Sequence, residues 1–278
     1  MQDDRKYICL YHADCLDGFT AAYNLTKFVS VDAIYPVKYG ENPPDVKGKH
    51  VIIVDFSYPK AALLEMQAES ILIIDHHKTA EADLAGLPAP ARFTVPESGI
   101  HAVFDMNKSG ASLVHWFFSE QPTPMLTRFV EDRDLWRFNL RETRDFIARL
   151  ALSDKTLKNW RAIEELQGSD FRNFLAEGSI LRRNHTHQCY EYAIGTLTLE
   201  DIGGHLVPVC NVPWTHASET AHLMLELYPD APFAATFFIH KGKRKYSLRS
   251  EDSRLDVSEI ARANGGGGHR NAAGFSYE

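Results

Sequence analysis

The sequence predicts an α/β protein that begins with a parallel-sheet domain with crossover helices and ends with a smaller α+β domain. Short apolar runs alternate with helical patterns through the first half of the chain, which is typical of βαβ units. The run 71–74 (Ile-Leu-Ile-Ile) is apolar throughout, as in a strand buried on both faces of a sheet. Near Ile194-Gly195 the pattern changes to strands separated by short polar turns, which indicates a second domain.

The first domain is expected at 1–184 and includes a connecting helix at its C-terminal end. Apolar periodicity predicts strands at 7–11, 33–37, 51–54 and 71–74, and helices at 18–28, 59–67 and 109–120. A proline near the first turn of 59–67, and Ser109 or Ser112 near the start of 109–120, are typical of helix N-termini. The segment 83–96 contains prolines and is predicted to be irregular, and 129–192 is mostly helical in pattern and highly charged.

The second domain is expected at 194–278. The pattern predicts strands at 196–199, 206–212, 233–239 and 245–249, with a helix at 217–227. A run of four glycines, 265–268, follows near the C-terminal end and directly precedes His269.

The overall composition limits the classes of function. The chain has 278 residues, 44% of them hydrophobic, and a formal net charge of −7, so a phosphate-bearing substrate needs a local basic site or metal ions. Four cysteines without a CxxC pair indicate a reducing compartment without disulfides. The charged residues Asp3, Asp4, Arg5 and Lys6 argue against a signal peptide, and no apolar run reaches the roughly 20 residues of a membrane span. We therefore expect a cytoplasmic protein without a membrane partner.

Three predicted strands end in acids or imidazoles. The first leads into His12-Ala13-Asp14-Cys15-Leu16-Asp17-Gly18, the third into Asp55, and the fourth into Asp75-His76-His77. Parallel strands place these ends at one edge of the sheet, where open α/β folds bind ligands. A single acid after a strand is usually a cap or turn residue, but three such ends together favour a metal site. Oxygen and imidazole ligands suit Mn²⁺ or Mg²⁺ and, less specifically, Fe²⁺, Co²⁺ or Zn²⁺, and several carboxylates favour two ions that share an acid.

These motifs resemble those of the DHH phosphoesterase superfamily, which includes RecJ and the nanoRNases. Residues 12–18, 54–57 and 74–77 resemble its first three motifs, and 132–138 resembles the fourth, with Asp132 as the first candidate acid and Asp134 as the second. Residues 247–250, 256–257 and 265–274 resemble the DHHA1 substrate domain that accompanies the DHH domain.

The resemblance implies a role for each motif residue. His12 and Asp14 would hold one metal ion, Asp17, His76 and Asp132 the other, and Asp55 would bridge the two. Asp75 would orient an imidazole, and His77 would contact the scissile phosphate. The two acids of the first motif are three residues apart, where the superfamily usually spaces them by two. Asp14 therefore acts either directly or through water.

Substrate recognition is expected in the second domain. Glycines followed by polar residues predict backbone N–H groups that hold an anion, with a flexible loop as the alternative. Arg249 predicts bidentate phosphate binding, with a surface ion pair as the alternative. The expected substrate-binding residues are Arg249, Gly266, Gly267, Gly268, His269, Arg270 and Asn271.

The resemblance implies a phosphoric diester hydrolase that converts short oligoribonucleotides or linear dinucleotides such as pGpG to mononucleotides, from the 3′ or the 5′ end. Two divalent ions would serve it, Mn²⁺ first and Mg²⁺ or Co²⁺ as alternatives. An acidic chain with one local anion site does not suit long duplex nucleic acid. The open alternatives are a phosphatase for 3′-phosphoadenosine 5′-phosphate (pAp), a cyclic-dinucleotide phosphodiesterase, and a nucleotide-binding sensor module without catalysis; a homodimer is also open.

Several conspicuous residues are expected to be structural. His185-Thr-His187 has no typical zinc partner pattern, and His115 is expected to be structural or exposed. The aromatic residues Phe19, Phe56, Tyr58 and Trp136 flank the metal motifs, where core packing is favoured over base stacking.

Overall fold

A computed structural model describes residues 5–277 of the chain, which divides into two compact units, Met1–Ser179 and Ile180–Glu278. Asp3 and Asp4, two of the four charged residues on which the expectation of no signal peptide depends, lie outside the described residues. None of the described helices is long and apolar enough to cross a bilayer.

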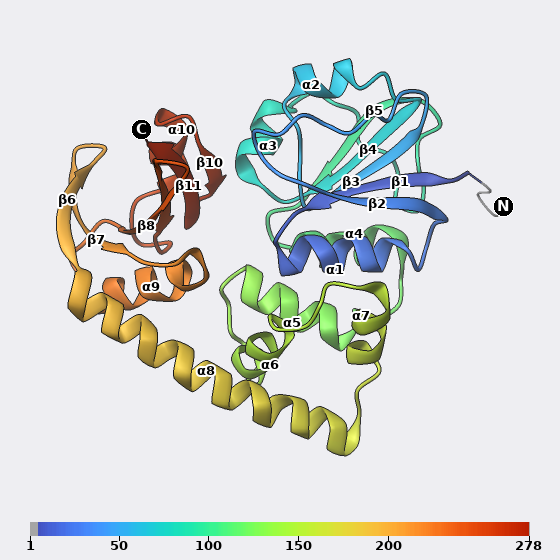
Figure 1. Ribbon diagram of the computed structural model, residues 1–278. Helices are drawn as coiled ribbons and strands as arrows, with labels where there is room; N and C mark the ends of the chain where they lie inside the picture. Colours follow the sequence, from blue (N-terminus) through green and yellow to red (C-terminus); the bar gives the residue numbers. More distant parts are fainter. Residues whose placement is uncertain (1–4, 278) are drawn as a thin grey trace. The chain divides into compact units, whose positions relative to one another are not determined.

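The first unit is built on a five-stranded parallel sheet (Figure 1). In spatial order its strands are β2 (Val31–Val37), β1 (Tyr7–His12), β3 (His50–Val54), β4 (Ser70–Asp75) and β5 (Gly99–Phe104). The four predicted strands are present and the predicted fold class is confirmed. The sequence pattern assigned no element to β5, because this edge strand is only partly buried and carries His101 in its centre. Pro36 lies in the other edge strand, β2, where a missing N–H is tolerated.

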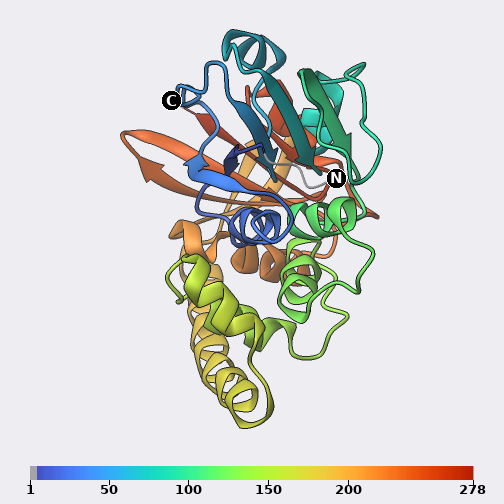
Figure 2. The same ribbon diagram turned by 90° about the vertical axis from the view of Figure 1, so that its right-hand side faces the viewer.

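Helices cover both faces of this sheet, so its central strands are apolar on both sides. Helices α1 (Leu16–Leu25) and α4 (Gly110–Phe118) lie on one face, and α2 (Lys60–Glu65) and α3 (Lys78–Asp83) on the other (Figure 1). In β3, Ile52 and Val54 pack into the core with α1 and α4, whereas Val51 and Ile53 pack into the core on the α2 side. In Figure 2, α1 (blue) and α4 (green) are seen nearly end-on beside each other. Every residue of β4 is buried, as the run 71–74 predicted.

The rest of the first unit is helical and extends the core beneath α1. It comprises α5 (Met125–Asp134), α6 (Thr143–Leu150), α7 (Leu157–Glu164) and the first part of the 29-residue α8 (Gly168–Thr196). Trp160 of α7 is fully buried, and its indole N–H donates a hydrogen bond of 2.9 Å to Thr20 Oγ1 of α1. The rings of Phe129 and Phe146 stack with centroids 4.5 Å apart and join α5 to α6.

The second unit contains a six-stranded mixed sheet. In spatial order its strands are β10 (Gly267–His269), β11 (Ala272–Tyr277), β9 (Lys243–Arg249), β8 (Ala234–His240), β7 (His205–Asn211) and β6 (Thr198–Ile202). Among the described pairs only β7 and β8 are parallel. Helix α9 (Ala217–Leu227) has the predicted bounds, and η1 (Trp214–His216) precedes it. Helix α10 (Val257–Ala263) and strands β10 and β11 were not predicted.

The glycine run is an ordered turn and strand rather than a flexible loop. The N–H groups of Gly265 and Gly266 donate to the carbonyls of Arg262 and Ala261 at the end of α10. A Cβ on Gly266 would lie 2.0 Å from the carbonyl oxygen of Gly274 in β11, and one on Gly268 would lie 2.5 Å from that of Ala272. Gly266 and Gly268 are therefore required by close backbone packing, and the N–H of Gly266 is not available to a phosphate, contrary to the expected cradle.

Candidate metal centre

The motif residues leave the carboxyl edge of the first sheet at the point where the strand order reverses. The chain proceeds from β1 outwards to β2 and then returns to β3 on the other side of β1. His12 is the last residue of β1, Asp55 directly follows β3, and Asp75 ends β4. Such a reversal leaves a crevice between neighbouring strand ends, which is where open α/β sheets bind ligands.

One group of three potential ligands contains Asp17, Asp55 and His76. Their ligand atoms all lie within 4.8 Å of one another, and all three residues are buried. The Nε2 atom of His76 lies 3.0 Å from Oδ1 of Asp55 and 3.7 Å from Oδ2 of Asp17. Asp17 is held in this position by the backbone N–H of Ala111, which donates to its Oδ1 at 3.1 Å.

A second group contains His12, Asp55 and His77, again with ligand atoms within 4.8 Å of one another. The Nδ1 atom of His12 lies 3.7 Å from Oδ2 of Asp55, whereas His76 lies closest to Oδ1 of the same carboxylate. Asp55 therefore belongs to both groups and presents a different oxygen to each.

The local backbone explains how Asp55 reaches this position. Its N–H donates to the carbonyl of Ile74 in β4 at 3.0 Å, and its φ of +54° lies in the left-handed region, which aspartate tolerates better than most residues. Gly110 at the start of α4 leaves room for it, since a Cβ there would lie 2.5 Å from Cβ of Asp55 and 2.9 Å from Oδ2 of Asp17. Gly110 was not predicted from the sequence, where its only signal is a glycine directly after the capping Ser109.

Asp75 supports the cluster from behind and is fully buried. Its carboxylate accepts hydrogen bonds from Ser57 Oγ at 2.8 Å and from the backbone N–H of His76 at 2.8 Å, and lies 2.7 Å from Nδ1 of His77. Burial opposes ionisation of Asp75, but the facing His77 lowers its pKa; conversely, burial opposes protonation of His77, yet Asp75 raises its pKa. This arrangement fixes which nitrogen of His77 faces Asp75, as the expected orienting role requires.

The electrostatics of the cluster fit a cation. Burial, followed by the neighbouring charges of Asp55 and Asp134, raises the pKa of Asp17 well above its usual range. Burial also opposes ionisation of Asp55, but the facing imidazoles of His12 and His76 hold its pKa well below the usual range. Burial works against protonation of His76, and the carboxylates of Asp55, Asp134 and Asp17 nevertheless raise its pKa to about 10.

Two buried oxygens, Oδ2 of Asp17 and Oδ2 of Asp55, accept no hydrogen bond from the residues that the structure describes. Buried carboxylate oxygens without donors are costly unless a cation or water satisfies them. The set of oxygen and imidazole donors suits Mn²⁺ or Mg²⁺, and the residues therefore fit the implied metal ions.

The acid of the fourth motif that reaches the cluster is Asp134, not Asp132. Oδ2 of Asp134 lies 3.5 Å from Nε2 of His76. The carboxylate of Asp132 instead accepts hydrogen bonds from the backbone N–H groups of Asn139 and Leu140, at 2.8 and 3.0 Å, and from the hydroxyl of Thr143. Asp132 thus holds the turn between α5 and α6, and the prediction that it is the fourth-motif ligand is wrong in this geometry.

Asp14 also lies outside both groups. Its backbone is left-handed, with φ of +59°, and its exposed carboxylate lies 2.6 Å from Nζ of Lys38. Hydrogen bonding with Lys38 lowers the pKa of Asp14. The three-residue spacing of the first motif places Asp17 on α1, facing the cluster, and leaves Asp14 on the preceding turn.

The predicted substrate residues of the second unit are held by protein contacts. The guanidinium of Arg249 donates to the carbonyl of Leu248 at 2.8 Å and to Ser218 Oγ of α9 at 2.6 Å. Arg270 donates to the carbonyls of Asp252 and Arg254, and Asn271 Nδ2 donates to Asp252 Oδ1 at 2.6 Å. Gly267, Gly268 and His269 form β10. Arg270 and Asn271 therefore anchor the loop after β9.

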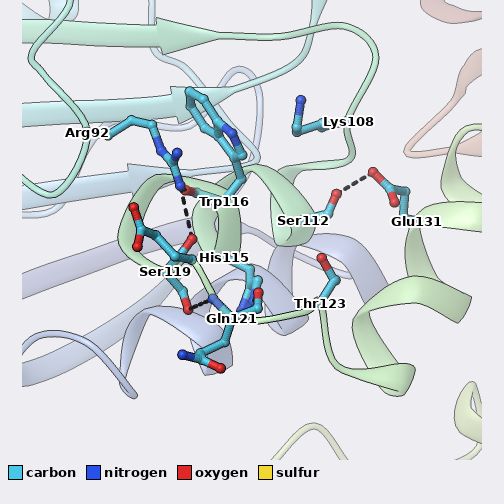
Figure 3. Close-up of a pocket in the computed structure, with 10 residues that line it drawn as sticks. Arg92, Lys108, Ser112, His115, Trp116, Ser119, Gln121, Thr123 and Glu131 are labelled. Atoms are coloured by element: carbon cyan, nitrogen blue, oxygen red, sulfur yellow. Dashed lines mark hydrogen bonds between the residues drawn. The ribbon is translucent and has the colours of Figure 1, made fainter.

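A separate pocket of about 450 Å³ lies in the first unit (Figure 3). Its lining includes Arg92, Lys108, His115 and Trp116, and none of the cluster residues. The guanidinium of Arg92 is engaged with the carbonyls of Trp116 and Ser119. Arg92 and Lys108 lie over the Trp116 ring, 4.5 and 5.2 Å from its centroid, and His115 is buried, in keeping with a structural role.

No family model matches the chain. Over 314 aligned residues it is 26% identical to the uncharacterized protein R106 of Acanthamoeba polyphaga mimivirus, in an alignment that covers 99% of this chain and 68% of that protein. Among solved structures, it resembles the DHH domain of a member of the s1p family of ribosomal proteins, with a TM-score of 0.59 and 12% identity over 98% of this chain and 82% of that one. It also resembles RecJ from Thermus thermophilus in complex with Mn²⁺, with a TM-score of 0.50 and 16% identity over 99% of this chain and 50% of that one. These likenesses concern the fold.

Proposed function

We propose that this chain, which has the fold of the DHH-domain proteins, hydrolyses phosphodiester bonds with two divalent metal ions. The observation that carries the proposal is the pair of ligand groups that share Asp55. A single structural metal site needs no acid between two ligand groups, whereas a carboxylate in that position can hold two ions close enough together to act on one phosphate.

One ion would be held by Asp17, His76 and Asp134, the other by His12, and Asp55 would bridge them. His77 belongs to the second group by distance, and it would either complete that ligand set or face the phosphate. Two divalent ions held here would neutralise charge on a phosphodiester and make water acidic enough to attack at neutral pH. Mn²⁺ is the first choice, because the donors are carboxylate and imidazole and RecJ is described with Mn²⁺.

In the arrangement in which His77 faces the phosphate, the Asp75–His77 pair would supply positive charge next to it. Asp75 holds Nδ1 of His77 and favours its protonated form, which leaves Nε2 as a donor towards charge that develops on the phosphate oxygens. Ser57 keeps Asp75 in place on its other oxygen. Buried packing around Asp75 keeps this pair out of bulk water.

The proposed substrates are short oligoribonucleotides or linear dinucleotides such as pGpG, which yield mononucleotides. The net charge of −7 supports a short substrate, because a long strand needs an extended basic track. Within the second unit, Arg249, whose guanidinium is oriented by Ser218, would bind a phosphate of the substrate.

The test is turnover by the purified full chain with Mn²⁺ against pGpG, pAp, a five-residue RNA, a five-residue DNA and cyclic di-AMP. We expect mononucleotide release from pGpG and RNA, a loss of roughly 10³-fold or more in Asp55→Asn, and unchanged activity in Asp32→Asn, whose exposed carboxylate pairs with Lys6. Normal turnover after complete chelation, or an active Asp55→Asn variant, would contradict the proposal. If pAp or cyclic di-AMP is the preferred substrate, the proposed substrate is wrong but the proposed two-metal hydrolysis still holds.

A further inference from the structure

Beside the candidate metal centre the first unit carries an exposed aromatic side chain, Tyr39. Its ring centroid lies 5.5 Å from that of His12 and 6.2 Å from that of His77, edge-on to both. Tyr39 is nevertheless 54% exposed. An aromatic ring that contacts two site imidazoles and still faces solvent has a free surface at the place where the phosphate would bind.

The backbone fixes where this ring lies. Lys38, Tyr39, Gly40 and Glu41 form a turn after β2, in which the N–H of Glu41 donates to the carbonyl of Lys38 at 3.2 Å. Gly40 has φ of +83°, which the third position of such a turn requires and which glycine adopts without strain. The ion pair of Lys38 with Asp14 connects the turn to the first motif.

Tyr39 also packs against Phe56, which is fully buried. The two ring centroids lie 4.5 Å apart, and about half of the Tyr39 side chain still remains exposed. The other aromatic residues that flank the first two motifs, Phe19 and Tyr58, are buried as expected of core residues. Among these side chains Tyr39 is therefore the one that can stack on a ligand.

We propose that Tyr39 stacks on the nucleobase next to the scissile phosphate, and that the site is thereby selective for nucleotide esters over pyrophosphate or polyphosphate. The inference rests on the proposed function, because it takes the residues around Asp55 as the phosphate site. Aromatic stacking is tolerant of base identity, so Tyr39 selects for the presence of a base and not for one base. The hydroxyl of Tyr39 has no part in this role.

The first experiment compares a 5′-phosphorylated diadenylate with the same compound lacking one of the two bases that flank the scissile bond. Tyr39→Leu is expected to raise the KM for the diadenylate roughly tenfold, with kcat changed less than about threefold. Tyr39→Leu is expected to lower kcat/KM for the abasic compound by a factor roughly fivefold smaller than for the diadenylate. Tyr39→Phe is expected to restore the KM for the diadenylate. Tyr35→Leu is the matched control, because Tyr35 lies on β2, is 44% exposed and has no ring contact with the cluster among the described pairs. Equal losses on the two substrates, or a loss confined to kcat, would overturn the assignment.

A second experiment separates this inference from the proposed function. Binding of AMP and of ribose 5-phosphate to the full chain with Mn²⁺ is measured by calorimetry, which requires no turnover. We expect AMP to bind roughly fivefold or more tightly than ribose 5-phosphate in the wild type, and this preference to disappear in Tyr39→Leu. Equal affinity of the wild type for both ligands, or a preference that persists in Tyr39→Leu, would refute the role of Tyr39 whether or not the chain hydrolyses diesters.

Discussion

Asp132 and Asp134 lie two residues apart at the end of α5, yet their carboxylates meet different surroundings. Sequence similarity to the fourth motif favoured Asp132, because a motif aligns positions and does not show which side of a helix end each carboxylate faces. In the structure Asp134 faces His76, whereas Asp132 accepts hydrogen bonds from the backbone of the turn that follows α5. The residues of the second and third motifs were easier to place, since each follows a buried strand directly.

These two acids provide a matched pair of variants. Asp134→Asn is expected to weaken Mn²⁺ binding roughly tenfold or more and to lower turnover in parallel, with little change in the free energy of unfolding, because burial already disfavours its charge and raises its pKa. Asp132→Asn is expected to cost about 1–3 kcal/mol of stability, because it weakens three hydrogen bonds, two of them partly buried and one fully buried. Mn²⁺ titration calorimetry and urea unfolding measure both effects, and the opposite pattern would restore Asp132 as the ligand.

At the scale of elements, strands and helices with strong apolar periodicity could be predicted, and weakly patterned ones could not. Strand β4 is buried throughout and was evident, whereas β5 is a partly exposed edge strand with a histidine in its centre. Strand β10 is made of glycine and histidine, so its pairing with β11 depends on tertiary contact and leaves no local signal.

The glycine turn before β10 tests this interpretation. Gly266→Ala is expected to lower the free energy of unfolding by about 1–3 kcal/mol or more, because the added Cβ meets the backbone of β11. Gly195→Ala, in open space near the end of α8, is expected to be neutral or slightly stabilising. Urea unfolding of the two variants gives the comparison; equal effects would show that packing does not require the run.

The contact between α8 and α9 predicts a pH dependence of stability. Hydrogen bonding to Cys189 and the facing Glu219, opposed by burial, raise the pKa of His185 from its ordinary value of 6.5 to about 10. A group whose pKa is raised by folding stabilises the folded state fully at pH values below its ordinary pKa. This stabilisation is lost as the pH rises towards the raised pKa. Burial and, second, the charge of His185 lower the pKa of the neighbouring His216. Protonation of His216 therefore affects stability only below its ordinary pKa of 6.5.

Wild-type protein is therefore expected to lose more unfolding free energy between about pH 7 and 9.5 than His185→Gln does. His187→Gln is the control, because His187 lies on the same helix and is exposed. Urea unfolding across this pH range is the measurement. An identical slope for wild type and His185→Gln would remove His185 as the cause.

At the scale of the whole molecule, the proposed metal ligands all come from the first unit. Each ion bound at about 100 times its Kd is expected to add about 2.7 kcal/mol to the free energy of unfolding of that unit. Hydrogen exchange is expected to slow with Mn²⁺ in segments 12–18 and 74–77 and to stay unchanged in β6 to β9. Asp55→Asn is expected to abolish the slowing of exchange by Mn²⁺. Protection of β6 to β9 alone would instead show that the metal site lies in the second unit.

The left-handed backbone of Asp55 has a consequence for how this protein can evolve. At φ of +54° most side chains cost about 1–2 kcal/mol, while asparagine and glycine are accepted readily. A lineage that loses the proposed hydrolysis can therefore accept asparagine or glycine at this position, and either residue removes the negative charge that the two ligand groups share while it keeps the turn. The fold can persist without the proposed chemistry, so an inactive descendant would be recognisable by asparagine or glycine at position 55.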